Sequence, residues 1–291
     1  MEKLVSIIIP NWNGIKDTQE CLESLKNLDY SNYEIIIVDN GSEDDSVEIL
    51  NANYPLIKVI ENEANLGFAK ANNQGILEAR GYYILLLNND TVVDKRFLSE
   101  LVKTIEINNE IGIVGPKMYY YDDPHRLWAA GGGRLNWYTG RIKILGRNES
   151  DDGQYDETKD VDFIAGCALL TKKALFKRIG CLNEKYFAYY EDTDWCIRAN
   201  ENGYKSVYVP TSKIWHKVSA SAINIGGFYR YYNTRNRFWF LRNHKSSNRY
   251  LIFLIYFFII EFWLDILYFV KNNQEDSFKC FLKGIKSGLK S

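Results

Sequence analysis

The chain has 291 residues, of which 46% are hydrophobic and 25% charged, so its composition is that of a globular protein and not of a disordered or fibrous one. The formal net charge of −1 hides an asymmetry, because residues 1–204 carry 22 Lys and Arg against 33 Asp and Glu, whereas residues 205–291 carry 14 against 4. Such a basic block attracts phosphate, anionic lipid or nucleic acid.

The first 116 residues alternate short apolar runs with helical patterns, which predicts an α/β fold with a Rossmann-like, doubly wound and mostly parallel sheet. Near-continuous runs of Ile, Val and Leu are typical of strands covered on both faces. The expected strands are Val5–Ile9, Glu34–Val38, Ile57–Ile60, Tyr82–Leu87 and Ile111–Val114. The expected helices lie near Asp17–Leu28, Asp45–Asn51, Phe68–Ala79 and Phe97–Asn108.

The pattern changes after Pro116. Residues 119–160 are rich in Gly, Tyr and charge, and we expect irregular loops and short hairpins there. The later elements expected are a strand at Val161–Thr171, helices at Lys172–Ile179 and from Glu191 to about Asn202, and a strand at Ser206–Val209 that Pro210 ends. We therefore divide the chain into one domain of residues 1–217, with halves 1–116 and 117–217, and an extension of residues 218–291.

The extension contains a nearly apolar stretch, Tyr250–Val270, that is interrupted by Glu261 and Asp265. Its 21 residues match the length of a membrane-spanning helix, but two acidic residues cancel most of the free energy gained by insertion. Because they lie four apart on one helical face, the pattern favours a helix lying in the membrane surface beside the basic block. Packing on the protein's own core or on a partner subunit is the alternative.

The cellular compartment is indicated by two further features. The five cysteines are scattered and show neither metal-finger spacing nor a disulfide framework. The apolar run at Val5–Ile9 is too short for a signal peptide. We expect a cytoplasmic protein that is peripheral on the inner face of the cell membrane.

The most informative motif follows the fourth expected strand, where Asn88, Asn89 and Asp90 come directly after a buried apolar run. In an open α/β sheet, ligands bind at the carboxyl ends of the strands. A carboxylate there can hold a divalent cation against substrate phosphates, because Mg²⁺ takes one or two protein carboxylates and fills its other sites with water and phosphate oxygen. The alternative is an Asp that opens a turn or caps the next helix.

Other strand ends carry similar polar clusters. The first reads Pro10-Asn11-Trp12-Asn13-Gly14, where a ligand can rest on the Trp12 ring or Trp12 can belong to the core. The second ends on Asp39, which suits a ribose hydroxyl or a base N–H but also an ordinary turn. The Gly-rich dinucleotide fingerprint and the P-loop are missing from the sequence, which counts against a dehydrogenase or a kinase-like NTPase.

Two later segments add candidates. Asn65 and Gly67 precede an expected helix whose first N–H groups can meet an anion, although its small residues can equally serve close packing. Glu191-Asp192-Thr193-Asp194 opens another helix, where simple capping is the alternative to catalysis. Arg198, about two turns into that helix, can pair with a carboxylate or a phosphate.

In order and spacing these segments resemble glycosyltransferase family 2, and in particular its rhamnosyltransferase-like members. The likeness extends over residues 4–217. It is carried by the runs Ser6–Asn13, Val38–Ser42, Asn65–Ala69 with Asn72–Gly75, Leu87–Thr91, Phe163–Ala168, Tyr189–Arg198 and Trp215–His216. The resemblance implies the A-type nucleotide-sugar fold and an inverting transfer.

The resemblance also implies roles for single residues. Asp90 and His216 are expected to hold Mg²⁺ or Mn²⁺, and Asp192 to act as the general base, with Glu191 as its rival. Asn88 stands where many members have the first Asp of Asp-x-Asp, so an oxygen is kept and a charge is lost. The residues expected to contact the donor are Pro10, Trp12, Asn13, Asp39, Asn65, Gly67, Lys70, Asn88, Asn89 and Gly166.

These implications predict a metal-assisted transfer of a sugar from a nucleoside-diphosphate donor to a hydroxyl of a glycan or lipid-linked acceptor. The donor expected from the subgroup is dTDP-rhamnose, with a UDP-hexose as the alternative. Because Asp192 lies at a helix N-terminus, the helix dipole is expected to favour its ionised form. Three rival interpretations are transfer to polyprenyl phosphate, an inactive nucleotide-sugar-binding membrane scaffold, and nucleic-acid binding without a recognised module. A homodimer is left open.

Overall fold

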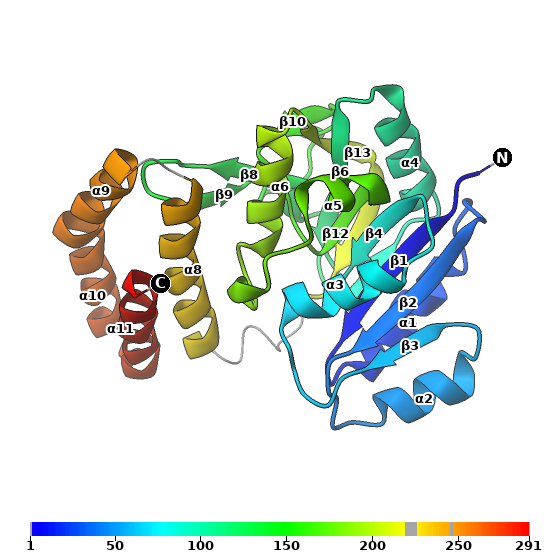
Figure 1. The fold of residues 1–291 in the computed structure, drawn as a ribbon, viewed down its shortest axis with the longest axis horizontal. Helices are drawn as coiled ribbons and strands as arrows, with labels where there is room; N and C mark the ends of the chain where they lie inside the picture. Colours follow the sequence, from blue (N-terminus) through cyan, green and yellow to red (C-terminus); the bar gives the residue numbers. More distant parts are fainter. Residues whose placement is uncertain (1, 219–225, 245–246, 291) are drawn as a thin grey trace. The chain divides into compact units, whose positions relative to one another are not determined.

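The structure is a computed structural model that describes residues 2–218, 226–244 and 247–290 (Figure 1). The contacts within the chain divide it into two compact units. The first comprises Met1–Arg134, Ile144–Phe187 and Glu191–Val218, and the second Leu135–Lys143, Ala188–Tyr190 and Ser219–Ser291.

The first unit is built on a sheet with the strand order β10-β13-β6-β12-β4-β1-β2-β3. The strands are β1 (Val5–Asn11), β2 (Tyr33–Asp39), β3 (Lys58–Glu61), β4 (Tyr83–Leu87), β6 (Ile111–Tyr120), β10 (Lys159–Val161), β12 (Ala168–Lys172) and β13 (Lys205–His216). Two further strands pair at its side, β5 (Thr91–Val93) with β13 and β7 (Leu127–Ala130) with β6. A second, three-stranded sheet has the order β11 (Phe163–Ile164), β8 (Gly132–Leu135), β9 (Ile142–Ile144).

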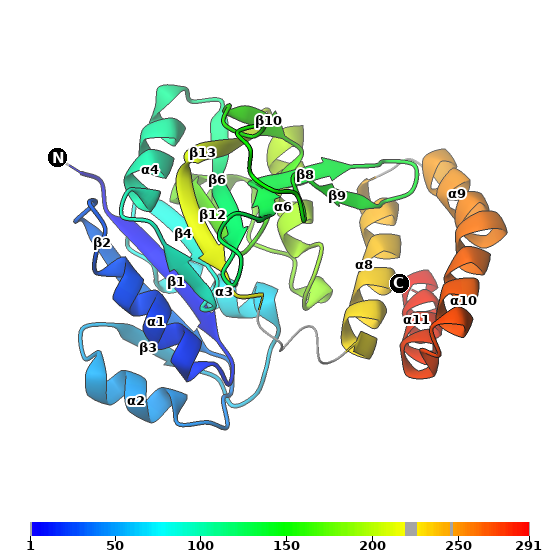
Figure 2. The same cartoon turned by 180° about the vertical axis from the view of Figure 1, so that it is seen from behind.

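Pairing is parallel across β3-β2-β1-β4 and between β6 and β13, while β12 runs antiparallel to both of its neighbours. The helices of this unit are α1 (Ile15–Leu25), α2 (Ser46–Asn53), α3 (Phe68–Glu78), α4 (Phe97–Ile107), α5 (Lys173–Ile179), the 3₁₀ turn η1 (Glu184–Tyr186) and α6 (Glu191–Glu201). α3, α5 and α6 lie in front of the sheet in Figure 1, and α1 and α4 in Figure 2, so the sheet is covered on both faces.

Burial on both faces explains the composition of the central strands. Ile7, Ile8 and Ile9 of β1 are all fully buried, as a strand between two helical layers requires. α3 packs so closely on β1 that a Cβ added to Gly75 would lie 2.4 Å from Ile8 Cγ2. The small residues of this helix therefore serve close packing. The predicted strands and helices of residues 1–116 are confirmed to within a few residues, and so is the α/β fold class.

Two strands are longer than expected, and the expectation that Pro210 ends a strand is wrong. β6 continues through Pro116 to Tyr120, and Pro116 lies between the residues that pair with β12 and those that pair with β7. β13 continues through Pro210 to His216, because Pro210 falls in a register shift between Val209 and Lys213. At Pro210 the missing N–H falls outside the paired register and costs no ladder hydrogen bond.

The region after Pro116 contains short paired strands, as the expected short hairpins require. Residues 119–160 contain β7, β8, β9 and the beginning of β10. The single strand expected at Val161–Thr171 is instead interrupted between β11 and β12, where Ala165 N–H donates to Gly131 O. This interruption places Gly166 in a loop beside α6.

The second unit is mainly helical. It contains α8 (Gly226–His244), α9 (Ser247–Tyr256), the π-helical turn η2 (Phe257–Glu261), α10 (Phe262–Lys271) and α11 (Glu275–Leu289). α8 and α11 pack closely through small residues four apart, since a Cβ on Gly284 would lie 2.7 Å from Tyr231 O and one on Gly288 would lie 2.8 Å from Phe238 Cβ. Asn236 Nδ2 of α8 donates to the carbonyls of residues 188 and 189, each at 2.7 Å.

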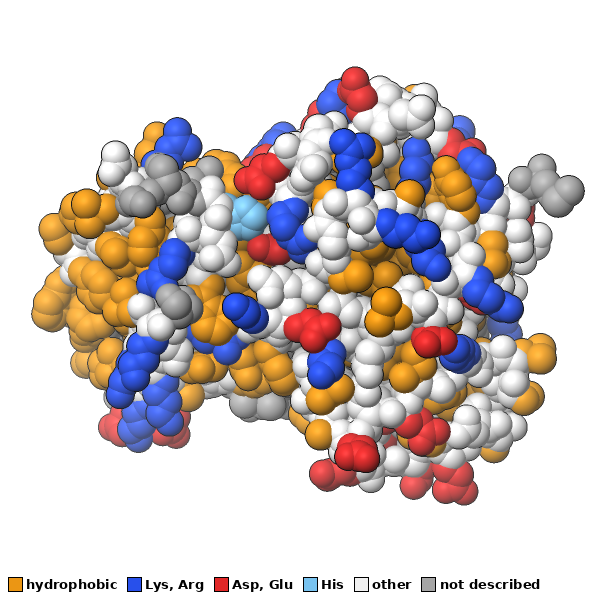
Figure 3. Space-filling view, viewed as in Figure 1, with side chains coloured by type: hydrophobic (Ala, Val, Ile, Leu, Met, Phe, Trp, Pro, Cys, Tyr) orange, Lys and Arg blue, Asp and Glu red, His pale blue; other side chains and the backbone are white. Residues whose placement is uncertain are grey.

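The apolar stretch forms one helical run, and within the described residues Asn248–Lys271 is the one helix long and apolar enough to cross a membrane. Length and composition alone are weak evidence for crossing. Only 17% of the most apolar 18-residue segment of this helix is buried. The helix turns Phe253, Phe257 and Phe269 inward. The opposite face exposes Ile259, Trp263, Leu264, Leu267 and Val270 among others, and Figure 3 shows hydrophobic side chains gathered over α9 and α10.

Glu261 does not lie on a solvated polar face, as the membrane-surface interpretation assumed. It is 2% exposed, its Oε2 accepts from Arg237 Nη2 at 2.7 Å, and its Oε1 lies 3.0 Å from Arg141 Nη2. The π-helical turn ends at this residue. The acidic side chain is thus neutralised inside the unit, which leaves the outer face of the helix apolar.

Candidate active site

The carboxyl ends of β1, β2 and β4 bring three of the predicted motifs to one edge of the sheet. Asn11, which follows the half-buried Pro10, lies opposite Asp39 in the parallel register of β1 and β2. β4 is the other neighbour of β1, and Asn88 follows its last residue. The motifs therefore share the edge at which open α/β sheets bind ligands.

Asn11 was not among the predicted site residues, yet it connects these strand ends. Its Nδ2 donates to Asp39 Oδ1 at 2.7 Å, and its Oδ1 accepts from Thr18 Oγ1 at 2.8 Å. Asn89 Nδ2 donates to the same Asn11 Oδ1 at 3.2 Å and to Thr18 Oγ1 at 3.0 Å. Asn89 thus fixes the end of β4 against β1. The only sequence signal for Asn11 was its place inside the first strand-end motif.

The turn after β2 holds the Asp39 carboxylate inside the protein. Asp39 is 1% exposed, and its Oδ2 accepts from Ser42 N–H at 2.9 Å while its Oδ1 accepts from Ser42 Oγ at 2.6 Å. Ser42 Oγ also accepts from Asn13 N–H at 2.9 Å. Trp12 is 39% exposed, so the interpretation that it belongs to the core is wrong. An exposed Trp12 therefore follows Asn11, whose Nδ2 donates to the buried Asp39 carboxylate.

Two N–H groups at the start of α3, those of the N-cap Gly67 and of Phe68, are bound within the protein. Asn65 Oδ1 accepts from Gly67 N–H at 2.9 Å, and Phe68 N–H donates to Phe187 O at 2.7 Å. Gly67 has φ +86°, and a Cβ there would lie 2.6 Å from Phe187 O, so this position requires glycine. These two N–H groups are therefore not available to an anion. The half-buried Lys70 lies in the same first turn.

Asp90 and His216 lie side by side, although 126 positions separate them in the sequence. The pairing of β5 with β13 sets His216 opposite Thr91, and Lys217 N–H donates to Asp90 O at 2.9 Å. His216 Nε2 lies 3.1 Å from Asp90 Oδ1, and both residues are less than 10% exposed. Asn88 Oδ1 and His216 Nδ1 are buried without a hydrogen-bond partner among the described residues.

This pair fits a divalent cation. Neighbouring ligands of an octahedral ion lie about 3 Å apart, because each is about 2.1 Å from the metal, and Asp90 Oδ1 and His216 Nε2 are 3.1 Å apart. In the part of the chain that the structure describes, no group of three or more His, Cys, Asp and Glu side chains forms a metal cage. An ion held here would complete its shell with water and substrate oxygen, as Mg²⁺ commonly does.

Asp192 is oriented by two backbone N–H groups. Its Oδ2 accepts from Gly166 N–H at 2.8 Å and its Oδ1 from Thr193 N–H at 2.6 Å. Burial nevertheless raises the pKa of the Asp192 carboxyl above its usual value, which outweighs these bonds. Burial thus acts against the effect expected from the helix dipole, which favours the ionised form. The side chain is half-buried and remains accessible.

Glu191 differs from its neighbour in exposure. It is 5% exposed, and burial together with the charge of Asp192 raises the pKa of its carboxyl well above the usual value. Its Oε2 has no hydrogen-bond partner within the described residues. Of the two carboxyl groups, Glu191 is the more buried and Asp192 the more accessible.

Asp90 and Asp192 converge on Cys167. Cys167 follows Gly166, which binds Asp192, and the Cys167 carbonyl accepts from Asn88 N–H at 2.8 Å. Burial raises the pKa of the Cys167 thiol well above its usual value, and the charges of Asp90 and Asp192 raise it further. Both carboxylates are therefore near enough to act electrostatically on one side chain.

The remaining charges of α6 are structural. Arg198 Nε donates to Asp194 Oδ2 at 2.9 Å, and Tyr186 OH donates to Asp194 Oδ1 at 3.2 Å. The other guanidinium nitrogens of Arg198 donate to the carbonyls of Ile179 and Cys181. Of the two partners that the sequence allowed for Arg198, the structure shows a carboxylate.

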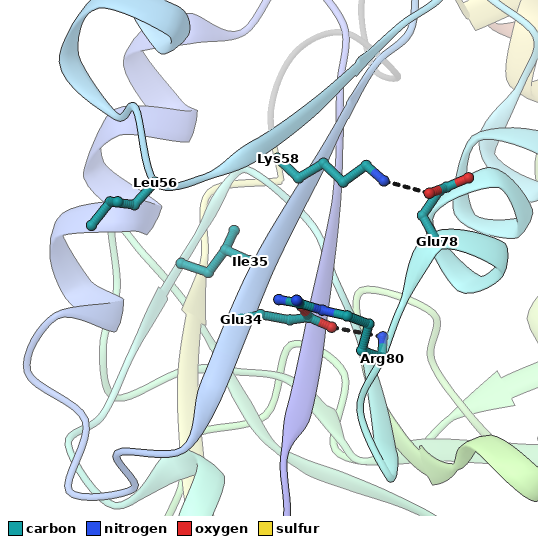
Figure 4. A pocket seen from close by; sticks show the side chains of 6 residues that line it. All are labelled: Glu34, Ile35, Leu56, Lys58, Glu78 and Arg80. Carbon is teal, nitrogen blue, oxygen red and sulfur yellow. Dashed lines mark hydrogen bonds and ion pairs between the residues drawn. The ribbon is translucent and has the colours of Figure 1, made fainter.

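A hollow at the other end of the sheet is not part of this site. Figure 4 shows its lining side chains, which include the ion pairs of Lys58 with Glu78 and of Arg80 with Glu34, the latter at 2.7 Å. The hollow has a volume of about 460 Å³. Because Glu34 and Lys58 lie at the beginnings of β2 and β3, it is at the end of the strands opposite to Asp39.

Comparison with known families decides the classification. The model of "Glycosyl transferase family 2" matches residues 6–179, which is more than half of the chain. The chain belongs to glycosyltransferase family 2. The resemblance proposed from the motifs is thereby confirmed.

Curated relatives of family 2 are distant. The chain is 28% identical to "Glycosyltransferase GlyG" of Streptococcus pneumoniae serotype 4, over 64% of this chain and 62% of the relative, so it spans less than two thirds of that protein. It is 26% identical to "dTDP-rhamnosyl transferase RfbF" of Shigella flexneri, over 84% of this chain and 82% of the relative.

Solved structures agree on the fold. The mannosyltransferase PcManGT from Pyrobaculum calidifontis, solved with GDP-Man and Mn²⁺, matches with a TM-score of 0.62 and 16% identity, over 99% of this chain and 74% of that one. At this identity the match shows the shared A-type glycosyltransferase fold and nothing about substrates.

Proposed function

We propose that this chain is an inverting, metal-dependent glycosyltransferase that moves a sugar from a nucleoside-diphosphate donor to a hydroxyl acceptor. The observation that carries the proposal is that the loop of Gly166 and Cys167 joins the two acidic motifs, since Asn88 N–H donates to Cys167 O and Gly166 N–H donates to Asp192 Oδ2, each at 2.8 Å. An inverting displacement needs a carboxylate beside the acceptor hydroxyl and a cation at the leaving diphosphate, on opposite faces of one carbon. The positions of Asp90 and Asp192, with different partners at one edge of the sheet, support this assignment of the two roles.

Asp192 is the proposed general base. Gly166 and Thr193 hold its carboxylate in one orientation, so it can accept the proton of the acceptor hydroxyl as the oxygen attacks the anomeric carbon. Burial raises the pKa of Asp192 toward the pH at which an enzyme works. A base whose pKa lies nearer that pH transfers protons more efficiently.

Asp90 and His216 are the residues proposed to hold the cation, with Asn88 contributing a neutral oxygen. A bound Mg²⁺ or Mn²⁺ neutralises charge that develops on the leaving diphosphate. On the other side of β1, Asp39 is proposed to contact the nucleobase or ribose, and Trp12 to stack on the nucleoside. Lys70 at the start of α3 is proposed to meet a phosphate oxygen.

The donor and acceptor are proposed from a relative and from charge. The relative named as a dTDP-rhamnosyl transferase favours dTDP-rhamnose as the donor, with a UDP-hexose as the alternative. We propose a glycan or lipid-linked acceptor at the inner membrane face, because residues 205–291 carry 14 basic against 4 acidic residues and Asn248–Lys271 exposes an apolar face. Such a helix binds the headgroup boundary of anionic membranes.

The test separates binding from chemistry. Asp192→Asn should retain donor binding in the presence of Mn²⁺ and lose at least 100-fold in the rate of sugar transfer, as expected for removal of a general base. In the wild type, the transfer rate should rise with pH through a pKa above the usual value of about 3.9 for Asp. A fully active Asp192→Asn with unchanged donor binding would favour transfer to polyprenyl phosphate, whose ionised acceptor needs no base.

The inactive scaffold is tested by the cation site. Donor hydrolysis with Mn²⁺ that Asp90→Ala abolishes is the result expected for an enzyme. Donor binding without hydrolysis or transfer, in the wild type and in Asp90→Ala alike, would favour a nucleotide-sugar-binding scaffold.

A further inference from the structure

A second layer of side chains lies beside the Asp90–His216 pair, and no role follows for it from the family motifs. The Trp128 indole and the His216 ring form a T-shaped pair, with 4.8 Å between ring centroids and 87° between planes. Arg147 lies over the Trp128 ring with its Cζ 6.0 Å from the centroid. The distance from Arg147 Cζ to the centroid of the His216 ring is therefore at most the sum of these two distances.

The backbone is built to place Trp128. The register between β6 and β7 shifts at this point, because Met118 pairs with Ala129 whereas Tyr119 pairs with Leu127. Trp128 is therefore the additional residue of a β-bulge. Bulges redirect side chains and are frequent beside active sites.

The position of Arg147 is equally determined by the backbone. The turn containing it is fastened to β7, since Leu127 N–H donates to Glu149 O and Asn148 N–H donates to Leu127 O, both at 2.9 Å. Gly146 and Asn148, on either side of Arg147, both have left-handed backbone, with φ of 71° and 65°. This turn carries Arg147 over the indole.

Two basic residues lie near His216, namely Lys217 and Arg147, and Arg147 is the one whose charge is available to a ligand. Lys217 is adjacent to His216, but it is already paired with Asp17, at 2.7 Å, and with Glu20. Arg147 is exposed and has no acidic partner within 4 Å among the described residues. A guanidinium suits phosphate because its N–H groups form paired hydrogen bonds with two phosphate oxygens.

We propose that Trp128 is a positioning residue that fixes the ring of His216, and that it presents Arg147 as an additional cation for the diphosphate of the nucleotide sugar. This inference rests on the proposed function, since it names a further contact of the same donor. Trp128 limits rotation of the His216 ring, so that Nε2 stays directed at Asp90. Arg147 adds positive charge where the leaving group becomes more negative, which is where preorganised charge accelerates transfer most.

Four variants of the full chain test the proposal by titration calorimetry, with Mn²⁺ alone, and with UDP and dTDP in the presence of Mn²⁺, as probes. Arg147→Gln should weaken diphosphate binding about tenfold, as expected for loss of a charged hydrogen bond, reduce its salt dependence, and leave Mn²⁺ binding unchanged. The matched control is Arg178→Gln, because Arg178 is also exposed and lies over an aromatic ring, Tyr204, beside the start of β13. It should have no effect on either titration.

Trp128→Leu and Trp128→Phe separate ring contact from bulk. Trp128→Leu should weaken both Mn²⁺ and diphosphate binding, whereas Trp128→Phe, which keeps an aromatic edge against His216, should retain most of the Mn²⁺ affinity. Thermal unfolding verifies that each variant is folded.

The outcomes are distinguishable. If wild type binds the diphosphates and Arg147→Gln binds them equally well, the role of Arg147 is wrong. If Trp128→Leu and Trp128→Phe bind Mn²⁺ equally, the positioning role of Trp128 is wrong. If wild type binds neither diphosphate with Mn²⁺, the proposed function itself is wrong.

Discussion

The buried ion pair of the helical unit gives the most quantitative prediction. Glu261 is 3% and Arg237 9% exposed at their side chains, and two hydrogen bonds join them. Removing one partner of a buried pair leaves an uncompensated charge and costs about 3–5 kcal/mol of unfolding free energy. Glu261→Met should cost that amount. Arg237→Met should cost less, because Glu261 keeps its contact with the largely exposed Arg141.

The double variant Glu261→Met/Arg237→Met should be more stable than either single variant, since an apolar pair of similar volume replaces a buried ion pair at little cost. The assay is urea unfolding of the full chain, followed by circular dichroism. Asp276→Asn, which breaks an exposed pair with Lys279 on α11, is the control and should change stability by less than about 1 kcal/mol.

The ion pair should also make the unfolding free energy depend on pH. The hydrogen bonds from Arg237 hold the pKa of Glu261 below its ordinary value despite burial. A carboxyl with a lowered folded-state pKa contributes stability above its unfolded pKa of about 4.3, and that stability is lost as the pH falls through the folded-state pKa. Glu261→Met should lack this acid-dependent component. Single variants within 0.5 kcal/mol of wild type, or losses that simply add in the double variant, would refute the argument.

Three further predictions follow from packing and exposure. Gly75→Ala should destabilise the chain by about 1–3 kcal/mol in urea unfolding, because its Cβ would lie 2.4 Å from Ile8 Cγ2; an unchanged midpoint would show that α3 can shift. Cys21 is fully buried and burial raises the pKa of its thiol to about 12, so a thiol reagent at pH 8 should modify the half-buried Cys280 first, and early modification of Cys21 would contradict this packing. Leu264→Glu, in the exposed apolar face, should reduce flotation with vesicles containing anionic lipid, and equal flotation would count against membrane docking by this helix.

The central strands and the strand-end motifs could be predicted from the sequence because their apolar runs are long and unambiguous. β1 is the clearest example, with Ile7 to Ile9 fully buried. Pro210 was misinterpreted because a proline ends a strand only where its N–H is needed. Which N–H is needed depends on partners far along the chain.

The electrostatics of the site were harder to predict than its residues. The sequence places Asp192 at a helix start, but it does not show that burial raises its pKa more than hydrogen bonds lower it. The sequence suggests that Glu261 lies on a solvated helix face, because it does not show the contacts of this residue with Arg237 and Arg141. The sequence around Trp128 does not predict where its side chain lies, because the bulge that directs this side chain arises from the pairing of β6 with β7.

The most direct test of the central claim is a crystal structure of the full chain with Mn²⁺ and a non-hydrolysable nucleoside-diphosphate sugar. We predict the cation on Asp90 and His216, and the anomeric carbon between that cation and the Asp192 carboxylate. A sugar bound with Asp192 directed away from its anomeric carbon, or a diphosphate bound away from Asp90, would contradict the account.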